Sequence, residues 1–271
     1  MTPHTMKYQF ASLTDPGKIR TNNEDAVAFD EEYGVAILAD GMGGYNAGEV
    51  ASGMATTFIK SELTRWFSSG AQNASSDQVA RALDICVQKA NTSILNAAVS
   101  NPHYAGMGTT LVVAVFQGLS MVLGHIGDSR CYRLRSGVLT PLTKDHSMLQ
   151  EQVDAGLMTP QQAAIAPGKN LLTRALGVED KVQMDVSTHQ VMDGDLFLMC
   201  SDGLTDMLDT LGIETVLKAD GALTQMAHML VSLANAHGGR DNIAVLLTKA
   251  QASPTKLGLM SVLFGKSPRS E

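Results

Sequence analysis

The chain contains little cysteine and no long apolar segment. Its 271 residues include three cysteines, Cys86, Cys131 and Cys200, which form no paired pattern and are expected to be buried free thiols. Residues 1–10 lack the apolar stretch of a signal peptide, and the longest apolar runs have the length of strands. We therefore expect a cytoplasmic protein, in a reducing compartment, with no transmembrane segment.

Positive charge is also scarce. The sequence has 20 Lys and Arg against 27 Asp and Glu, a formal net charge of -7, and no basic run. This balance argues against nucleic acid as a partner. An anionic substrate would have to be held locally, by an arginine or a metal ion, because the overall field repels it. Hydrophobic residues make up 44% of the chain, which is enough to bury a substantial core.

Several familiar catalytic motifs are missing. The histidines show no metal-ligand spacing, so core or surface roles are favoured over zinc binding. Gly106-Met107-Gly108 lacks the Lys-Ser/Thr that would continue a phosphate-binding loop. The sequence contains neither a Gly-x-Ser-x-Gly elbow nor a Cys-x5-Arg loop. Nucleophilic serine or cysteine chemistry is therefore disfavoured.

Carboxylates at the ends of predicted strands are what the sequence does contain. Asp40, Asp128 and Asp202 each follow a strand-like apolar run, and Asp241 directly precedes one. Each aspartate alone would be an ordinary turn residue. Strand ends that are remote in sequence can converge, however, and buried carboxylates cannot all stay ionised without a strong counter-charge. Divalent cations that prefer oxygen ligands would supply it.

Three further features could belong to such a site. Glu24-Asp25 would alone be a solvated acidic pair, and Arg20 a surface cation. Beside carboxylate-bound metal ions, however, a guanidinium is suited to bidentate capture of phosphate. Gly43-Gly44, shortly after Asp40, permits close approach of the backbone to a ligand.

Hydrophobic periodicity predicts strands and helices in alternating groups. Long helices are predicted over residues 47–67 and from an N-cap at Asp77 to about Val99, with shorter ones over 213–218 and 223–236. Residues 144–177 carry glycine and proline and few large apolar side chains, which is typical of an inserted, mobile lobe. Strands are predicted over 6–13, 25–29, 33–39, 109–116, 119–126, 131–134, 138–142, 183–188, 196–200 and 243–248. This order favours layers of helix and antiparallel sheet.

The order of the motifs resembles that of a known family, the PPM-type metal-dependent protein serine/threonine phosphatases (the protein phosphatase 2C group), in its bacterial branch. The resemblance covers about residues 7–249. It is carried by Arg20-x-x-Asn23-Glu24-Asp25, Asp40-Gly41-Met42-Gly43-Gly44, Gly106-Met107-Gly108-Thr109-Thr110, Gly127-Asp128-Ser129-Arg130, Asp145-His146-Ser147, Leu172-Thr173-Arg174-Ala175-Leu176-Gly177, Ser201-Asp202-Gly203-Leu204 and Asp241-Asn242.

The resemblance implies an α+β fold, a four-layer αββα sandwich in which helices flank two central antiparallel sheets. The phosphatase domain would span residues 1–250 and include a flap at about 144–177. A C-terminal tail would follow over residues 251–271, where cations flank the apolar stretch Leu257 to Phe264. Such a tail could dock on a partner or membrane surface, or be a frayed terminus packed on its own domain.

The resemblance also implies roles for single residues. Asp40 would bridge two metal ions, and Arg20 would hold the substrate phosphate. Animal relatives carry histidine where this chain has Met42, so no general acid is assigned. The implied metal ligands are Asp40, the Gly41 carbonyl, Asp202 and Asp241, with Glu24 and Asp25 acting directly or through water and Asp128 at a third metal position.

The implied activity is hydrolysis of phosphoserine and phosphothreonine in proteins by a hydroxide held between two cations. Mn²⁺ or Mg²⁺, two to three ions per chain, would fit an all-oxygen site. A monomer acting on phosphoproteins and opposing a cognate Ser/Thr kinase is expected. Two alternatives remain open: an inactive phosphoprotein-binding module of the same fold, and a phosphoesterase for small molecules.

Overall fold

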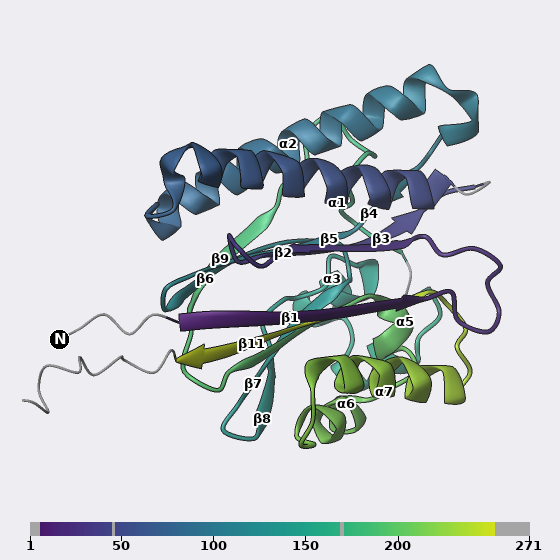
Figure 1. The fold of residues 1–271 in the computed structure, drawn as a ribbon. Coiled ribbons are helices and arrows are strands. Elements are labelled where there is room, and N and C mark those ends of the chain that lie inside the picture. Colours follow the sequence, from purple (N-terminus) through teal and green to yellow (C-terminus); the bar gives the residue numbers. More distant parts are fainter. Residues whose placement is uncertain (1–5, 45–46, 169–170, 253–271) are drawn as a thin grey trace, which may run out of the picture.

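The structure, a computed structural model, describes residues 6–44, 47–168 and 171–252. Two antiparallel sheets are stacked on each other between two helical layers (Figure 1). The predicted αββα sandwich is therefore confirmed. In the described ranges, no helix is both long and apolar enough to cross a membrane. The apolar stretch Leu257 to Phe264 lies outside the described residues.

The first sheet has the strand order β2-β3-β5-β6-β9, with β4 paired to β3. Two long antiparallel helices, α1 and α2, cover its outer face (Figure 1). The elements of this half are β2 (Asp25–Asp30), β3 (Val35–Met42), α1 (Ala47–Trp66), a π-helical turn (Phe67–Ala71), α2 (Ser76–Ser100), a 3₁₀ turn (Pro102–Tyr104), β4 (Gly108–Thr109), β5 (Leu111–Gln117), β6 (Ser120–Ile126) and β9 (Asp185–Gln190).

The second sheet has the order β1-β11-β10-β7-β8 and is covered by α6 and α7 (Figure 1). The short helix α5 begins at Asp202, and the flap contributes α3 and α4. The elements are β1 (Met6–Asp15), β7 (Arg130–Arg135), β8 (Val138–Pro141), α3 (Met148–Asp154), α4 (Pro160–Ile165), β10 (Leu196–Cys200), α5 (Asp202–Thr205), α6 (Thr210–Leu217), α7 (Leu223–Ala236) and β11 (Ile243–Ala252).

The alternation of side chains along the strands divides the core into layers and determines the face of β3 from which the Asp40 side chain projects. Successive side chains of a strand point to opposite faces. Along β3, Ile37 and Ala39 join the apolar cluster beneath α1 and α2, whereas Ala36 and Leu38 join the cluster between the sheets. Asp40 continues the second series, so it stands at the end of the layer between the sheets.

Several element boundaries differ from the sequence predictions, and two of them change an assignment. The N-cap of α2 is Ser75, not Asp77: the Ser75 hydroxyl accepts from the Gln78 N–H while the Gln78 side chain accepts from the Ser75 N–H. This reciprocal arrangement satisfies two backbone donors, and Asp77 falls in the first turn. Strand β11 runs to Ala252, opposite Met6. The predicted tail boundary at residue 251 therefore cuts into the sheet.

The cysteines are as predicted. Cys86, Cys131 and Cys200 are buried free thiols. In the described parts of the predicted flap, residues 144–168 and 171–177, the chain forms two short helices, α3 and α4, and backbone hydrogen bonds join both ends of the segment to the core. One attachment is an isolated antiparallel bridge between Thr109 and Leu176. The helix α5, which the periodicity did not predict, follows Ser201 directly.

Candidate active site

A cleft of about 190 Å³ opens where strands of both sheets end. The first sheet contributes Asp40, which lies directly opposite Asp25 in the pairing of β2 with β3. The second sheet contributes Asp202 after β10 and Asp241 before β11. Nearly every residue implied by the resemblance lines this cleft: Arg20, Glu24, Asp40, Gly41, Asp128, Asp202 and Asp241.

Asp25 and Asp40 are buried neighbours. Burial, and next the nearby Asp25 and Asp202, raise the pKa of Asp40 well above its usual range. Burial likewise raises the pKa of Asp25 to about 7. The Ser201 hydroxyl donates to Asp25 Oδ2 at 2.7 Å, whereas Asp25 Oδ1 is buried without a hydrogen-bond partner in the described part of the chain. An orphaned carboxylate oxygen of this kind is a position that a cation would satisfy.

The other aspartates of the cleft are affected in the same way. Burial, and then Asp241, raise the pKa of Asp202 to about 6. Burial, and then Asp202, raise the pKa of Asp128 to about 7. Carboxylates this close in a poorly hydrated site cannot all ionise unless positive charge is supplied. The donor set, which consists of oxygen atoms only, therefore fits hard divalent cations.

The carboxyl groups are not already arranged as a metal cage. Over residues 6–44, 47–168 and 171–252, no group of three or more His, Cys, Asp or Glu side chains is placed so that it could hold an ion as it stands. Burial and the neighbouring Asp25 and Asp202 instead oppose ionisation of Asp40. Cation binding in the cleft would therefore release protons.

Glycine brings the backbone of the cleft close to α1. A Cβ on Gly41 would lie 2.1 Å from the Gly48 carbonyl oxygen, and a Cβ on Gly48 would lie 2.8 Å from Glu24 Oε2. Any other residue at either position would push β3 and α1 apart. The two glycines therefore let Glu24 and the Gly41 backbone occupy the same wall.

Arg20 stands at the rim of the cleft. Its Nη2 lies 2.8 Å from Asp241 Oδ2, and its side chain is half exposed. A guanidinium carries five N–H donors, and this contact uses one of them. Arg20 can therefore keep its contact with Asp241 while it offers further donors to an anion.

Three supporting residues received no role from the sequence. Thr110 Oγ1 accepts the Asp40 N–H at 3.0 Å and lies 2.7 Å from Ser129 Oγ. Asn242 Oδ1 accepts the Glu24 N–H at 2.8 Å. Ser201, as described, donates to Asp25. In the sequence, Ser201 and Asn242 stand beside Asp202 and Asp241, whereas Thr110 ends a glycine- and threonine-containing motif without an acidic residue.

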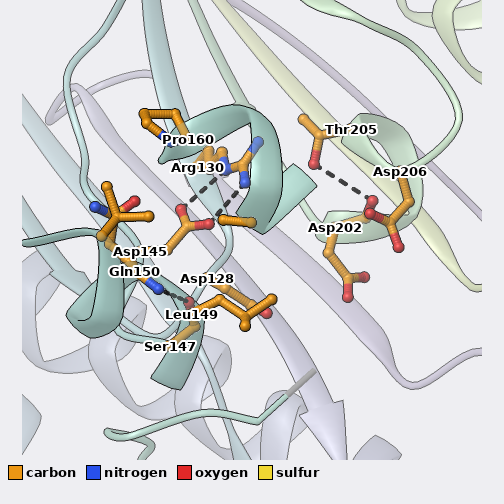
Figure 2. A pocket seen from close by; sticks show the side chains of 12 residues that line it. Asp128, Arg130, Asp145, Ser147, Leu149, Gln150, Pro160, Asp202, Thr205 and Asp206 are labelled. Carbon is orange, nitrogen blue, oxygen red and sulfur yellow. Dashed lines mark hydrogen bonds and ion pairs between the residues drawn. The ribbon is translucent and has the colours of Figure 1, made fainter. Parts of the chain in front are cut away.

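A second pocket, of about 330 Å³, lies between the flap helices and α5 (Figure 2). It shares Asp128 and Asp202 with the cleft. On its flap side, Arg130 Nε and Nη2 lie 2.9 and 2.6 Å from the two oxygens of Asp145 (Figure 2). This bidentate pair fixes the start of the flap to β7, close to the loop that carries Asp128.

Comparison with known proteins gives consistent results. A sequence model of the family described as "Protein phosphatase 2C" matches residues 18–244. The chain is 38% identical over 239 residues to the serine/threonine phosphatase stp of Listeria innocua, covering 87% of this chain and 93% of that protein. It is 37% identical over 253 residues to the protein phosphatase PhpP of Streptococcus pneumoniae, covering 88% of this chain and 96% of that protein.

Solved structures agree. The serine/threonine phosphatase PstP/Ppp of Mycobacterium tuberculosis superimposes with a TM-score of 0.82 at 36% identity, covering 89% of this chain and 98% of that one. The catalytic domain of PstP in complex with two manganese ions gives a TM-score of 0.80 at 35% identity, covering 91% of this chain and 100% of that one. The family match, the identities and the shared fold together show that this chain belongs to the protein phosphatase 2C family.

Proposed function

We propose that the chain is a metal-dependent protein phosphatase that hydrolyses phosphoserine and phosphothreonine in proteins. The observation that carries the proposal is the convergence of Asp40, Asp128, Asp202 and Asp241 on one small cleft, with Asp25 buried beside Asp40. The phosphatases to which the chain is similar support the substrate class. We further propose that it acts as a monomer in the cytoplasm and reverses the action of a Ser/Thr kinase.

Mn²⁺ or Mg²⁺, two to three ions per chain, is the proposed cofactor. The manganese complex of the related PstP domain and the oxygen-only donor set support this choice. Asp40 would bridge two ions and Asp128 would serve a third position. The remaining proposed ligands are the Gly41 carbonyl, Asp202 and Asp241, with Glu24 and Asp25 acting directly or through water. When bound, the ions would lower the pKa of a shared water and offset charge on the transferring phosphoryl group.

The chain's own residues would orient the phosphate and hold the ligands. Arg20, at the rim, would direct two N–H donors at the phosphoryl oxygens opposite the buried carboxylates. Thr110 would keep Asp40 in place by accepting the Asp40 backbone N–H. Asn242 would do the same for Glu24 by accepting the Glu24 backbone N–H. Met42, which lines the cleft, cannot transfer a proton. We therefore assign proton delivery to the leaving oxygen to no side chain.

The substrate class can be tested directly. With manganese present, we expect the purified protein to hydrolyse phosphoserine and phosphothreonine peptides at least about a hundredfold more efficiently, by kcat/KM, than sugar phosphates, because a phosphopeptide contacts the cleft surroundings as well as the site. Comparable efficiencies would favour a small-molecule phosphoesterase. Binding of phosphopeptides without turnover would favour the inactive binding module.

Arg20→Ala is expected to weaken phosphate capture. The variant loses charge-assisted hydrogen bonds to the phosphoryl oxygens, so KM for a phosphopeptide should rise about tenfold, with a smaller fall in kcat. Arg81, exposed on α2, provides a matched control, since Arg81→Ala removes the same charge away from the cleft. Unchanged kcat and KM in Arg20→Ala would remove Arg20 from the site.

A further inference from the structure

Two reciprocal hydrogen bonds join the loop that carries Asp128 to the beginning of the flap. The Gly127 N–H donates to His146 Nδ1 at 3.1 Å, and the His146 N–H donates to the Gly127 carbonyl at 2.8 Å. Gly127 has a φ of +100°, and a Cβ there would lie 2.7 Å from Thr110 Cγ2. The main chain just before Asp128 is therefore confined by both His146 and Thr110.

The bond from Gly127 determines which nitrogen of the His146 ring carries the proton. Because Nδ1 accepts, it must hold a lone pair, and the proton of the neutral ring is on Nε2. Nε2 lies 3.2 Å from Asp185 Oδ2, which can accept that proton. Arg174 Nη1 lies 2.8 Å from the other oxygen, Asp185 Oδ1, and 3.3 Å from His146 Nε2. Because a guanidinium only donates, its contact with the protonated Nε2 is not a hydrogen bond, and its N–H is directed to Asp185. One carboxylate on β9 thus orients both the ring and the guanidinium.

The surroundings of the ring keep it neutral. His146 is buried and lies against His125, with 4.7 Å between the ring centroids. Burial lowers the pKa of His146, and burial followed by the neighbouring His146 lowers the pKa of His125 to about 4. The charged groups facing His146 are Asp145, Arg174 and Asp185. A neutral ring leaves Nδ1 free to accept the Gly127 N–H.

His146 also holds the returning end of the flap. Its carbonyl accepts the Thr173 N–H at 2.9 Å, and the next residue, Ser147, forms an isolated antiparallel bridge with Leu172. Leu172 lines the cleft, whereas His146 is not among the residues that line it. A single buried residue is therefore bonded to the loop of Asp128 and to the segment that brings Leu172 to the cleft.

We propose that His146 is a positioning residue, whose Nδ1 holds Gly127 and thereby sets where the Asp128 carboxylate stands relative to the flap and the cleft. The kinetic consequences rest on the phosphatase function proposed above. The hydrogen bond itself requires neither metal nor substrate, so it can be tested separately.

Two substitutions distinguish the role of Nδ1 from that of Nε2. In His146→Asn, the amide oxygen takes the place of Nδ1 and can still accept the Gly127 N–H, but the contact with Asp185 is lost. In His146→Gln, the longer side chain places an N–H donor where Nε2 was, and the acceptor for Gly127 is lost. The melting temperature of each variant reports general destabilisation, which is distinct from positioning.

The first readout uses the metal-free, full-length protein. Nitrogen NMR of the wild type should show Nδ1 unprotonated and Nε2 protonated at neutral pH. Hydrogen exchange of the Gly127 amide should be about tenfold faster in His146→Gln than in the wild type, the effect of losing one hydrogen bond, and protected in His146→Asn. A protonated Nδ1, or equal protection of Gly127 in His146→Gln and the wild type, would overturn the proposal even if one variant failed to fold.

The second readout is kinetic. With manganese and a phosphopeptide, His146→Gln should lower kcat about tenfold with little change in KM, as for the loss of a residue that orients a ligand. Adding Asp128→Ala to His146→Gln should cost nothing beyond Asp128→Ala alone, and His146→Asn should turn over faster than His146→Gln. Equal losses in the two variants, or additive losses with Asp128→Ala, would contradict the proposal. If the wild type hydrolyses no phosphopeptide, the proposed function fails, and the exchange and NMR results still decide the role of His146.

Discussion

Asp40→Asn is expected to abolish phosphopeptide turnover, by on the order of a thousandfold or more, while the protein remains folded. The substitution keeps the size of the side chain but removes the charge that would bridge two cations. In the metal-free protein that charge is unfavourable, because burial and the neighbouring Asp25 and Asp202 oppose ionisation of Asp40. The melting temperature without metal should therefore hold or rise. The measurements are kcat at saturating manganese and thermal unfolding with a chelator.

The control for Asp40→Asn is the same change at a distant site. Asp84 is exposed on α2, so Asp84→Asn should alter neither turnover nor the effect of manganese on melting. Asp202→Asn and Asp241→Asn should behave like Asp40→Asn, since each removes a proposed ligand charge from the other sheet. Near-normal turnover in Asp40→Asn would reject the assignment of the bridging ligand.

Removal of divalent cations is expected to eliminate activity in the unaltered chain, again by on the order of a thousandfold, because no side chain in the cleft can replace them in activating water. Added manganese or magnesium should restore the activity. Cations that bind only the folded state also stabilise it, by about 2.7 kcal/mol at a hundred times Kd. Chelation should therefore lower the melting temperature. Activity that survives exhaustive chelation would exclude the proposed mechanism.

The metal-free protein should also lose stability as pH rises. In the folded state the pKa of Asp25 and of Asp128 is raised to about 7, and that of Asp202 to about 6, from an ordinary value of 3.8. Between about pH 4 and pH 7, these carboxyl groups keep their protons in the folded state but have lost them in the unfolded chain. The free energy of unfolding should therefore fall as pH rises from about 4 and level off above about pH 7. Thermal unfolding at pH 5 and pH 8 with a chelator measures this. A melting temperature that increased with pH would contradict it, and Asp40→Asn should flatten the dependence.

The layers and the convergence of the aspartates could be predicted because strand periodicity and strand ends are local properties of the sequence. Asp40 is an example: the apolar run before it indicated its position at the end of a strand. The helix α5 could not be predicted, since four residues are too few to show a helical period. Contacts such as Thr110 with Ser129, or Gly127 with His146, join side chains far apart along the chain. These contacts depend on sheet register and packing, neither of which can be predicted from the local pattern of a single sequence.

The pairing of β1 with β11 has a consequence for biosynthesis. In the described sheet β1 is an edge strand whose neighbour is β11, and the two pair over their full length, from Met6 opposite Ala252 to Asp15 opposite Ile243. More than two hundred residues separate them, so at typical ribosome speeds about 10 to 50 seconds pass before the partner of β1 exists. Of the strands in the described sheet, β1 is therefore made first and is among the last to be paired. A nascent chain that stops short of β11 leaves β1 with an open, hydrogen-bonding edge.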